Sequence, residues 1–399
     1  MDVLICGDIG GTHTRLALFP PGRPHDFVAS ESFASRDFPG FLPLLARFLD
    51  GRPGLRLRGA AFGIPGPVSP EPEDLWMVNL PWRIRVSQIA RKLKLPRVRF
   101  VNDFAAVALA VPHLKAGHLH ALGGGALAPH GPVAVLGAGT GLGESFLVWT
   151  GTRYLPVATE CGHADFAPRT DVEQRLLAYL RGRYGPVAWE RVLSGPGLVN
   201  LAEFLRDREG LEEVPALRAV LADLKGRDEA PAVITRLALG ATPDPLCARA
   251  VALFCALYGA EAGNAALRVM ATGGVYLAGG IAPRLLGPLS SGGFRAAFEA
   301  KQDFAEVLRA IPAWIVTHPN PGLLGAAIAA QEEADELAAD WSPTTRAPAA
   351  RTPARKPAAR PSGSPAGPRG TAPPAQRARP AQRARPARRK PPRHKPPRP

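Results

Sequence analysis

Three glycine-rich turns, each directly after a short apolar run, constrain this chain more than any other feature. The turns lie at residues 8–14, 137–143 and 278–281, and the apolar runs before them at 3–6, 133–136 and 275–278. A strand that ends in glycine lets backbone N–H groups come close to phosphate oxygens, because glycine has no Cβ and tolerates positive φ. The pattern therefore predicts three strand-and-turn units of the kind that clamp the phosphates of a nucleotide.

The order of the motifs is more informative than any one of them, because a single glycine turn is usually only a turn. In chain order they are Asp-x-Gly-Gly-Thr at 8–12, Asn-Asp at 102–103, Gly-x-Gly-Thr-Gly at 137–141 and Gly-Gly at 279–280. None is a Walker loop, since no Gly-Lys-Ser or Gly-Lys-Thr follows, and the middle turn lacks the last glycine of the dinucleotide fingerprint.

This order resembles that of the sugar kinases of the actin and hexokinase superfamily, and most closely the bacterial ATP-dependent glucokinases. The likeness continues in the stretches 160–166, 190–201, 291–299 and 320–325, and it covers about residues 1–335. It implies an α/β, two-lobed, ribonuclease H-like fold. The expected division is a small lobe over 1–112, completed by a helix at about 321–338, and a large lobe over 113–320.

The apolar pattern predicts the elements that carry these motifs. We expect a strand and its return strand over 3–19 with residues 12–14 in the turn, strands at 57–63 and 98–101, helices near 38–49, 87–95 and 326–337, and a mostly helical stretch at 171–239. The Asn102-Asp103 pair then lies where a strand ends, which is where ligands bind in open α/β sheets.

Asp103 is the candidate catalytic base. A carboxylate with a reference pKa of about 3.9 is ionised at neutral pH but is a weak base for an alcohol, so it takes the proton late, as the phosphoryl group transfers. Most of the rate must then come from positioning and charge neutralisation. The residues alone leave a second interpretation open, in which Asp103 caps a helix that begins at Phe104. The resemblance implies the base.

Sugar recognition requires polar groups that hydrogen-bond several hydroxyls at once. The resemblance implies that Asn102, Glu160, His163 and Glu190 hold the glucose hydroxyls together with Asp103. From the residues alone, the two glutamates could instead be solvated surface acids and His163 a structural histidine.

Cys161 departs from the glucokinase pattern, in which a glycine usually follows the glutamate at this point. A thiol there would narrow the sugar pocket or make it sensitive to oxidation. Cys161 and His163 also suggest zinc, but two ligands are half a site, and the cysteine-rich zinc motif of the related repressor and kinase family is missing.

The first turn carries Asp8, which is placed to hold Mg²⁺ through water, because magnesium keeps its waters and favours carboxylate and phosphate oxygens. By the resemblance, two turns approach the β and γ phosphates of ATP from opposite lobes and the third lies on the adenosine side: Gly10, Gly11 and Thr12; Gly139, Thr140 and Gly141; Gly279 and Gly280. From the residues alone, Gly280 could instead belong to a helix start before Pro283.

The composition changes abruptly at about residue 340. Residues 341–399 hold 16 of the 49 Lys and Arg, 16 of the 44 prolines and no Asp or Glu. So few large apolar residues cannot bury enough surface to offset the ordering entropy, so this basic tail is predicted to be disordered. It is interpreted either as a solvated extension or as a segment that binds an anionic partner weakly.

The remaining features predict a cytoplasmic protein without membrane spans. The four cysteines, at 6, 161, 247 and 255, show no paired spacing, which is typical of a reducing compartment. The first apolar run is too short for a signal peptide, and the apolar stretch around 251–258 is bounded by Arg249 and Glu261.

Two alternative functions stay open. The first is a kinase for another hexose or an amino sugar, because motif spacing does not encode hydroxyl stereochemistry. The second is a non-catalytic, sugar-sensing regulator whose tail binds nucleic acid. Regulators of this superfamily carry a helix-turn-helix before the first glycine turn, which here begins at residue 8. The resemblance further implies a homodimer.

Overall fold

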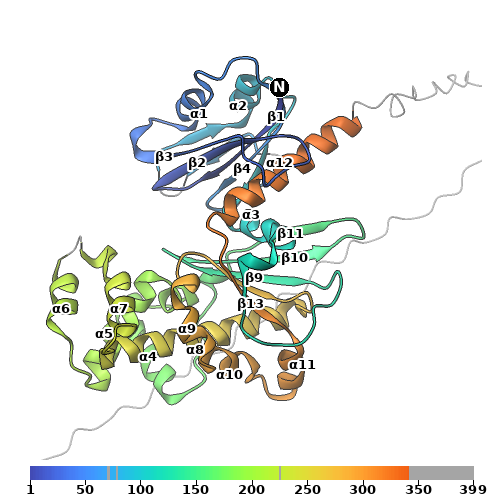
Figure 1. The fold of residues 1–399 in the computed structure, drawn as a ribbon. Helices are drawn as coiled ribbons and strands as arrows, with labels where there is room; N and C mark the ends of the chain where they lie inside the picture. Colours follow the sequence, from blue (N-terminus) through green and yellow to red (C-terminus); the bar gives the residue numbers. More distant parts are fainter. Residues whose placement is uncertain (70–71, 78–79, 224–225, 341–399) are drawn as a thin grey trace, which may run out of the picture. The chain divides into compact units, whose positions relative to one another are not determined.

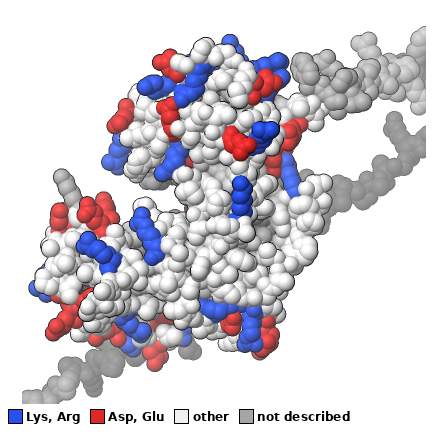
Figure 2. All heavy atoms as spheres, viewed as in Figure 1, with Lys and Arg blue, Asp and Glu red and all other residues white. Residues whose placement is uncertain are grey.

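The computed structural model describes residues 1–69, 72–77, 80–223 and 226–340, which belong to one compact unit with two large β-sheets (Figure 1). The tail at 341–399, predicted to be disordered, lies outside the described residues. Basic and acidic side chains are interspersed over the face shown in Figure 2. This mixture agrees with the 33 basic and 34 acidic residues that the sequence holds up to position 340.

The first sheet has five strands in the order β3-β2-β1-β4-β7. They are β1 (Asp2–Ile9), β2 (His13–Phe19), β3 (Ala29–Ala34), β4 (Arg56–Ile64) and β7 (Arg99–Asn102). β1 pairs antiparallel with β2 but parallel with β4, and β4 pairs parallel with β7. The carboxyl ends of β1, β4 and β7 therefore meet at one edge, which brings Asp8 and Asn102 to the same side of the molecule.

Helices cover both faces of the first sheet because alternate residues of the central strand β1 are apolar on both sides. Val3 and Ile5 pack in a core with α1 (Phe41–Leu49) and α2 (Val86–Leu93). Leu4 and Cys6 pack in a second core with α3 (Asp103–Ala110) and α12 (Pro321–Asp340). A small hairpin, β5 (Asp74–Trp76) with β6 (Arg83–Arg85), precedes α2.

The second sheet has six strands in the order β11-β10-β9-β12-β13-β8. They are β8 (Leu119–Ala121), β9 (Val133–Ala138), β10 (Leu142–Trp149), β11 (Tyr154–Ala158), β12 (Val275–Ala278) and β13 (Ala313–Val316). One face packs on α3, through Ala108 and Phe104 among others. Since α3 also packs against the first sheet, it is the element that joins the two sheets in the described part of the chain.

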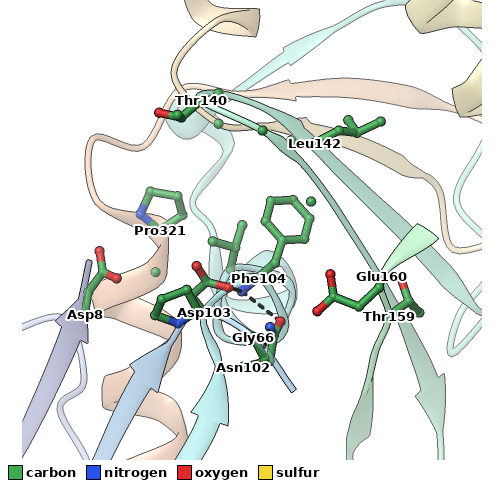
Figure 3. A pocket seen from close by; sticks show the side chains of 18 of the residues that line it. Asp8, Gly66, Asn102, Asp103, Phe104, Thr140, Leu142, Thr159, Glu160 and Pro321 are labelled. Carbon is green, nitrogen blue, oxygen red and sulfur yellow. Dashed lines mark hydrogen bonds between the residues drawn. The ribbon is translucent and has the colours of Figure 1, made fainter. Parts of the chain in front are cut away.

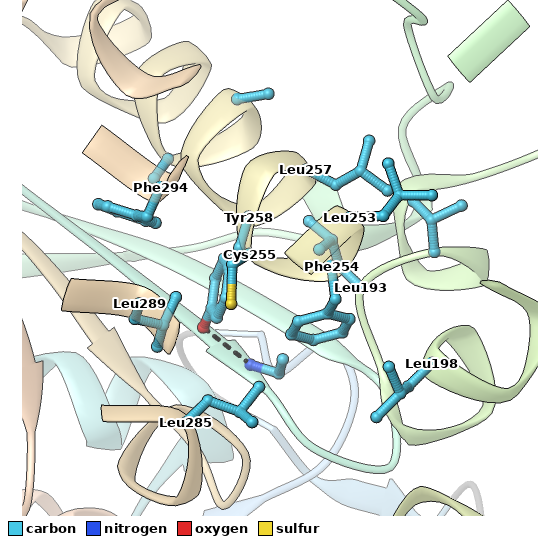
Figure 4. Close-up of a cluster of buried hydrophobic side chains, with 14 of the residues drawn as sticks. Leu193, Leu198, Leu253, Phe254, Cys255, Leu257, Tyr258, Leu285, Leu289 and Phe294 are labelled. Carbon is cyan, nitrogen blue, oxygen red and sulfur yellow. Dashed lines mark hydrogen bonds between the residues drawn. The ribbon is translucent and has the colours of Figure 1, made fainter. Parts of the chain in front are cut away.

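A helical layer covers the other face of the second sheet. It contains α4 (Asp171–Tyr184), α5 (Gly195–Glu209), α6 (Pro215–Ala222), α7 (Ala230–Ala238), α8 (Pro245–Val269), α9 (Leu286–Ser290), α10 (Gly293–Glu299) and α11 (Ala305–Ala310). Tyr258 of α8 ties this layer to β9, because its hydroxyl accepts from the Ala138 N–H at 3.1 Å and donates to the Leu136 carbonyl at 3.3 Å (Figure 4).

By length and composition alone, α8 could cross a membrane. However, 78% of its most apolar 18-residue window is buried inside the fold, as expected for the central helix of a core. No membrane span was predicted for this stretch, because Arg249 and Glu261 bound its apolar residues. The four cysteines are free, as expected from their spacing.

The predicted strands and helices are confirmed, with differences at two of their ends and with further elements that were not predicted. The first turn lies at residues 10–12 rather than 12–14, because β2 already begins at His13. The last helix begins at Pro321 rather than 326, since proline fits the first turn of a helix. The strands β3, β5, β6, β8, β10, β11 and β13 and the short helices α9, α10 and α11 were not predicted. In β10 the polar residues Glu144 and Ser145 interrupt the apolar pattern. The lobe boundaries at 112 and 320 stay a prediction.

Candidate active site

A cavity of about 900 Å³ lies where the ends of the two sheets face each other (Figure 3). Most of the residues predicted for the site line it: Asp8, Asn102, Asp103, Gly139, Thr140, Gly141, Glu160, His163, Glu190 and Gly279. The other four, Gly10, Gly11, Thr12 and Gly280, follow Asp8 and Gly279 in the chain and are described, but they are not among the lining residues.

Asn102 caps α3 and thereby fixes Asp103. The Asn102 Oδ1 accepts hydrogen bonds from the backbone N–H groups of Phe104, at 3.0 Å, and Ala105, at 2.9 Å. Its Nδ2 donates to the Gly66 carbonyl at 3.1 Å. The alternative in which Asp103 is the cap is therefore wrong. Asp103 is the first residue of α3, and its carboxylate points into the cavity (Figure 3).

The surroundings of Asp103 favour its protonated form. The pKa of Asp103 is raised to about 6, mainly by burial and also by the charges of Asp8 and Glu160. The Phe104 N–H, which donates to the Asp103 Oδ1 at 2.8 Å, acts in the opposite direction. A carboxylate with a raised pKa is a stronger base than a free aspartate, which suits it to accept a proton.

Asp8 lies at the end of β1, beside the first turn of α12. Burial raises the pKa of Asp8, and Arg15, 3.7 Å away, opposes this shift. Gly322 of α12 lies against the carboxylate, since a Cβ at that position would be in van der Waals contact with it at 3.4 Å. Asp8 and Asp103 thus place two acids in one cavity, an oxygen donor set that fits a hard cation such as Mg²⁺.

Glu190 is held against the strand that follows the middle glycine turn. It lies in a short 3₁₀ turn, η5 (Trp189–Arg191), and its Oε2 accepts from the Leu142 N–H at 3.2 Å. A Cβ on Gly141 would lie 2.4 Å from the same Oε2, so glycine is required there for Glu190 to come this close.

Glu160 enters the cavity from the segment after β11, opposite Asn102 (Figure 3). It is exposed, and its backbone carbonyl accepts from the His163 N–H at 3.0 Å. The preceding Thr159 also lines the cavity, and its hydroxyl donates to the Glu144 carbonyl at 2.7 Å. Glu160 and Glu190 both line one cavity with Asp103, and Glu160 is at the same time a solvated acid.

The middle and late glycine turns lie side by side because β9 and β12 are neighbouring parallel strands. Gly279 has a φ of +81°, and a Cβ there would lie 2.6 Å from the Ala138 carbonyl oxygen. A Cβ on Gly139 would instead meet no atom within 4 Å. Backbone conformation and close packing on Ala138 thus require glycine at position 279, whereas Gly139 faces open space.

Cys161 is partly buried at the start of the 3₁₀ turn η4 (Cys161–His163). Among the described residues, no three His, Cys, Asp or Glu side chains lie close enough together to hold a metal ion. The zinc interpretation of Cys161 and His163 therefore finds no support in the described part of the chain.

Sequence reasoning did not single out several lining residues: Arg15, Gly66, Phe104, Thr159 and Gly322. Gly322 lies within the stretch 320–325 that carries the family resemblance, so a signal for it was present. Arg15 and Thr159 reach the cavity through strand pairing, which neither local pattern nor motif reveals.

Acidic side chains at strand ends, opposite glycine turns of a second sheet, are the arrangement expected of a sugar kinase with the two-lobed actin and hexokinase fold, and solved structures share this fold. A solved glucokinase from an Antarctic psychrotroph has the same fold, with a TM-score of 0.71 at 29% identity, over 83% of this chain and 99% of that one. A glucokinase of the ROK family from Streptomyces griseus shares the fold with a TM-score of 0.54 at 21% identity, over 83% of this chain and 99% of that one.

Sequence relatives identify the family within this class. The model of the family described as Glucokinase matches residues 5–333. A glucokinase from Nostoc punctiforme is 37% identical over 340 residues, which are 83% of this chain and 99% of the relative. A glucokinase from Yersinia pestis is 38% identical over 325 residues, 81% of this chain and 94% of the relative. The chain belongs to the glucokinase family, as the sequence resemblance predicted.

Proposed function

We propose that this kinase transfers the γ-phosphoryl group of ATP to the 6-hydroxyl of D-glucose, giving glucose 6-phosphate and ADP. The observation that carries the proposal is the convergence of Asp103, Asp8, Glu160 and Glu190 on one cavity between glycine turns. The relative from Streptomyces griseus was solved with glucose and AMPPNP, and one from Balamuthia mandrillaris with glucose, which supports this pair of substrates.

Each side chain has a separate task in this reaction. Asp103 accepts the proton of the 6-hydroxyl as the phosphoryl group transfers. Asn102, Glu160, His163 and Glu190 accept and donate hydrogen bonds to the other hydroxyls and hold the sugar in line.

The nucleotide lies against the glycine turns. Gly10, Gly11 and Thr12 approach the β and γ phosphates from the first sheet, and Gly139, Thr140 and Gly141 approach them from the second. Gly279 and Gly280 face the adenosine. Asp8 would hold Mg²⁺ through water, and the ion supplies charge neutralisation for the phosphates when bound. The enzyme is expected to act in the cytoplasm as a homodimer, with the tail as an accessory segment.

A coupled assay for sugar-dependent ADP release tests the proposal. It is run with glucose, fructose, mannose, glucosamine and N-acetylglucosamine, on the full chain and on a chain stopped at Asp340. The proposal predicts that glucose gives the highest kcat/KM with both proteins, and that ADP release stops when the sugar is omitted. A higher kcat/KM on another hexose would overturn the substrate, and binding of glucose without turnover on any sugar would indicate a sensor.

A further inference from the structure

A second group of acids lies behind the sugar side of the cavity, buried between β10 and α8. Glu144 of β10 and Glu261 of α8 are both fully buried, and the Arg268 guanidinium contacts both. Its NH1 lies 3.2 Å from the Glu144 Oε2 and 2.5 Å from the Glu261 Oε1. Two carboxyl groups therefore share one guanidinium group.

The charges balance when one of the two carboxyl groups keeps its proton. The Glu144 Oε1 is buried and has no hydrogen-bond donor among the described residues, which is costly for an ionised oxygen. Burial and the charge of Glu261 raise the pKa of Glu144 above its ordinary value, while Arg268 opposes the shift. A protonated Glu144 can donate a hydrogen bond to Glu261, leaving one negative charge for one guanidinium.

Other polar or titratable residues lie near Glu144, Glu261 and Arg268 among the described residues: Lys301, Asn264, Tyr258 and Cys161. Lys301 lies within electrostatic reach of Glu261 and donates to the Ala260 carbonyl at 2.9 Å. Asn264 donates to the Glu261 Oε2 at 2.8 Å. Tyr258 lies near Glu144, and Cys161 lies near Arg268.

The strand that carries Glu144 also holds the acids predicted to bind sugar. The Leu142 N–H donates to Glu190, and the Glu144 carbonyl accepts from the Thr159 hydroxyl, directly before Glu160. The Thr159 hydroxyl in turn accepts from the Cys161 N–H at 3.3 Å. Gly162 packs so closely on Leu142 that an added Cβ would lie 2.1 Å from the Leu142 carbonyl oxygen. Displacement of β10 from α8 would therefore move Glu160 and Glu190 together.

We infer that Glu144, Arg268 and Glu261 form a positioning cluster, which fixes β10 on α8 and thereby sets the geometry of the sugar-binding glutamates. This inference rests on the proposed function, because it assigns the cluster to the glucose side and not to the nucleotide side. None of the three residues lines the cavity, so they act through Glu160 and Glu190.

The test compares Glu144→Leu, Glu144→Gln and a matched control, with separate KM values for glucose and ATP. Glu144→Leu removes one carboxyl group but leaves Arg268 paired with Glu261, so no buried charge is left alone. We expect its glucose KM to rise about tenfold while its ATP KM stays within about twofold. Glu144→Gln keeps a donor and an acceptor and should restore most of the glucose affinity at about pH 7.

The pH dependence gives a readout that a merely structural role would not move. Deprotonation of Glu144 in alkali adds a second negative charge beside Glu261, so the wild-type glucose KM should rise between about pH 7 and about pH 9. Glu144→Gln has no proton to lose there, and its glucose KM should rise less over the same interval. This comparison holds even if Glu144→Leu fails to fold.

The control is Glu203→Gln, which alters another buried glutamate between two arginines, Arg183 and Arg227, away from the cavity. Its glucose KM should stay within about twofold of wild type. Equal effects of Glu144→Leu on the glucose and ATP KM values, or an identical alkaline rise in wild type and Glu144→Gln, would overturn the positioning role alone. Absence of wild-type turnover on glucose would overturn the proposed function and the positioning role with it.

Discussion

The two sheets contribute acids of different character to the cavity. Asp8 and Asp103 come from the first sheet, at a strand end and at a strand-to-helix junction, and burial raises the pKa of both. Glu160, directly before one short 3₁₀ turn, and Glu190, within another, lie beside the second sheet. The two aspartates and Glu190 are half-buried, and Glu160 is exposed. Half-buried acids with raised pKa values suit proton and cation chemistry, whereas an acid near solvent suits reversible binding of hydroxyls.

This contrast suggests that the two sheets contribute to different kinetic parameters. Changes on the first sheet should act mainly on kcat, and changes on the second sheet mainly on the KM for glucose.

The largest effect is expected for Asp103→Asn. Removal of a general base typically lowers turnover by 10²–10⁴-fold, so we expect kcat to fall by about 10³-fold while glucose binding is kept. Steady-state kinetics and calorimetric titration with glucose measure the two quantities. A wild-type kcat in this variant would refute the assignment of Asp103 as the base.

The same variant should be more stable than the wild type at neutral pH. The folded-state pKa of Asp103, about 6, lies above its ordinary value of 3.8, so the folded state binds the proton more tightly than the unfolded state. Stability attributable to this group is therefore lost as pH rises through this range, and asparagine avoids the loss. A thermal melt at neutral pH checks the sign, and a lower Tm for the variant would contradict the account.

A smaller effect on kcat/KM is expected from lowering the pH. Because Asp103 must be ionised to accept a proton, kcat/KM should fall about tenfold per pH unit below its pKa of about 6. Asp8→Asn removes a negative neighbour, so its profile should be displaced to lower pH. An unchanged midpoint in Asp8→Asn would show that the two acids do not interact, which would weaken the contrast between the sheets.

Two glycines of the second sheet allow a matched comparison. Gly141→Ala places a Cβ 2.4 Å from the Glu190 Oε2 and must displace that carboxylate, so we expect the glucose KM to rise about tenfold. The Cβ of Gly139→Ala meets no atom within 4 Å, so the glucose KM should stay within about twofold of wild type. If a phosphate of ATP binds at that turn, the Cβ obstructs it and the ATP KM rises. An equal rise in glucose KM for both variants would contradict the role of Glu190 in sugar binding.

The smallest effect is expected from removal of the tail. A chain stopped at Asp340 keeps every residue that lines the cavity, so its kcat and KM values should stay within about twofold of the full chain. A large loss of kcat in the shortened chain would give residues 341–399 a part in catalysis that the cavity does not explain.

Local sequence was sufficient for the strand-and-turn units, because an apolar run followed by glycine specifies both the strand and its end. It also placed Asp8, Asn102 and Asp103 together, since they lie at the carboxyl ends of strands in one parallel set, whereas Glu160, His163 and Glu190 were predicted from the family resemblance. It was not sufficient for the capping role of Asn102, which depends on whether the helix starts one residue earlier or later.

Contacts between distant segments were beyond sequence reasoning. The approach of Gly322 to Asp8 and the meeting of Glu144 with Glu261 depend on how helices pack on sheets, and no local pattern encodes such a contact. The strand β10 was missed for the same reason, because its buried acid is stabilised by Arg268 from α8 rather than by a neighbour in the chain.

A crystal structure with glucose and a non-hydrolysable ATP analogue tests most directly whether the first sheet supplies the base and the second sheet the sugar-binding acids. We expect the glucose O6 at about 2.6–3.2 Å from the Asp103 carboxylate, the γ-phosphate on the side of Asp8, and Glu160 and Glu190 on the other hydroxyls. Glucose bound with its O6 turned away from Asp103, or with Glu160 and Glu190 facing only solvent, would contradict it.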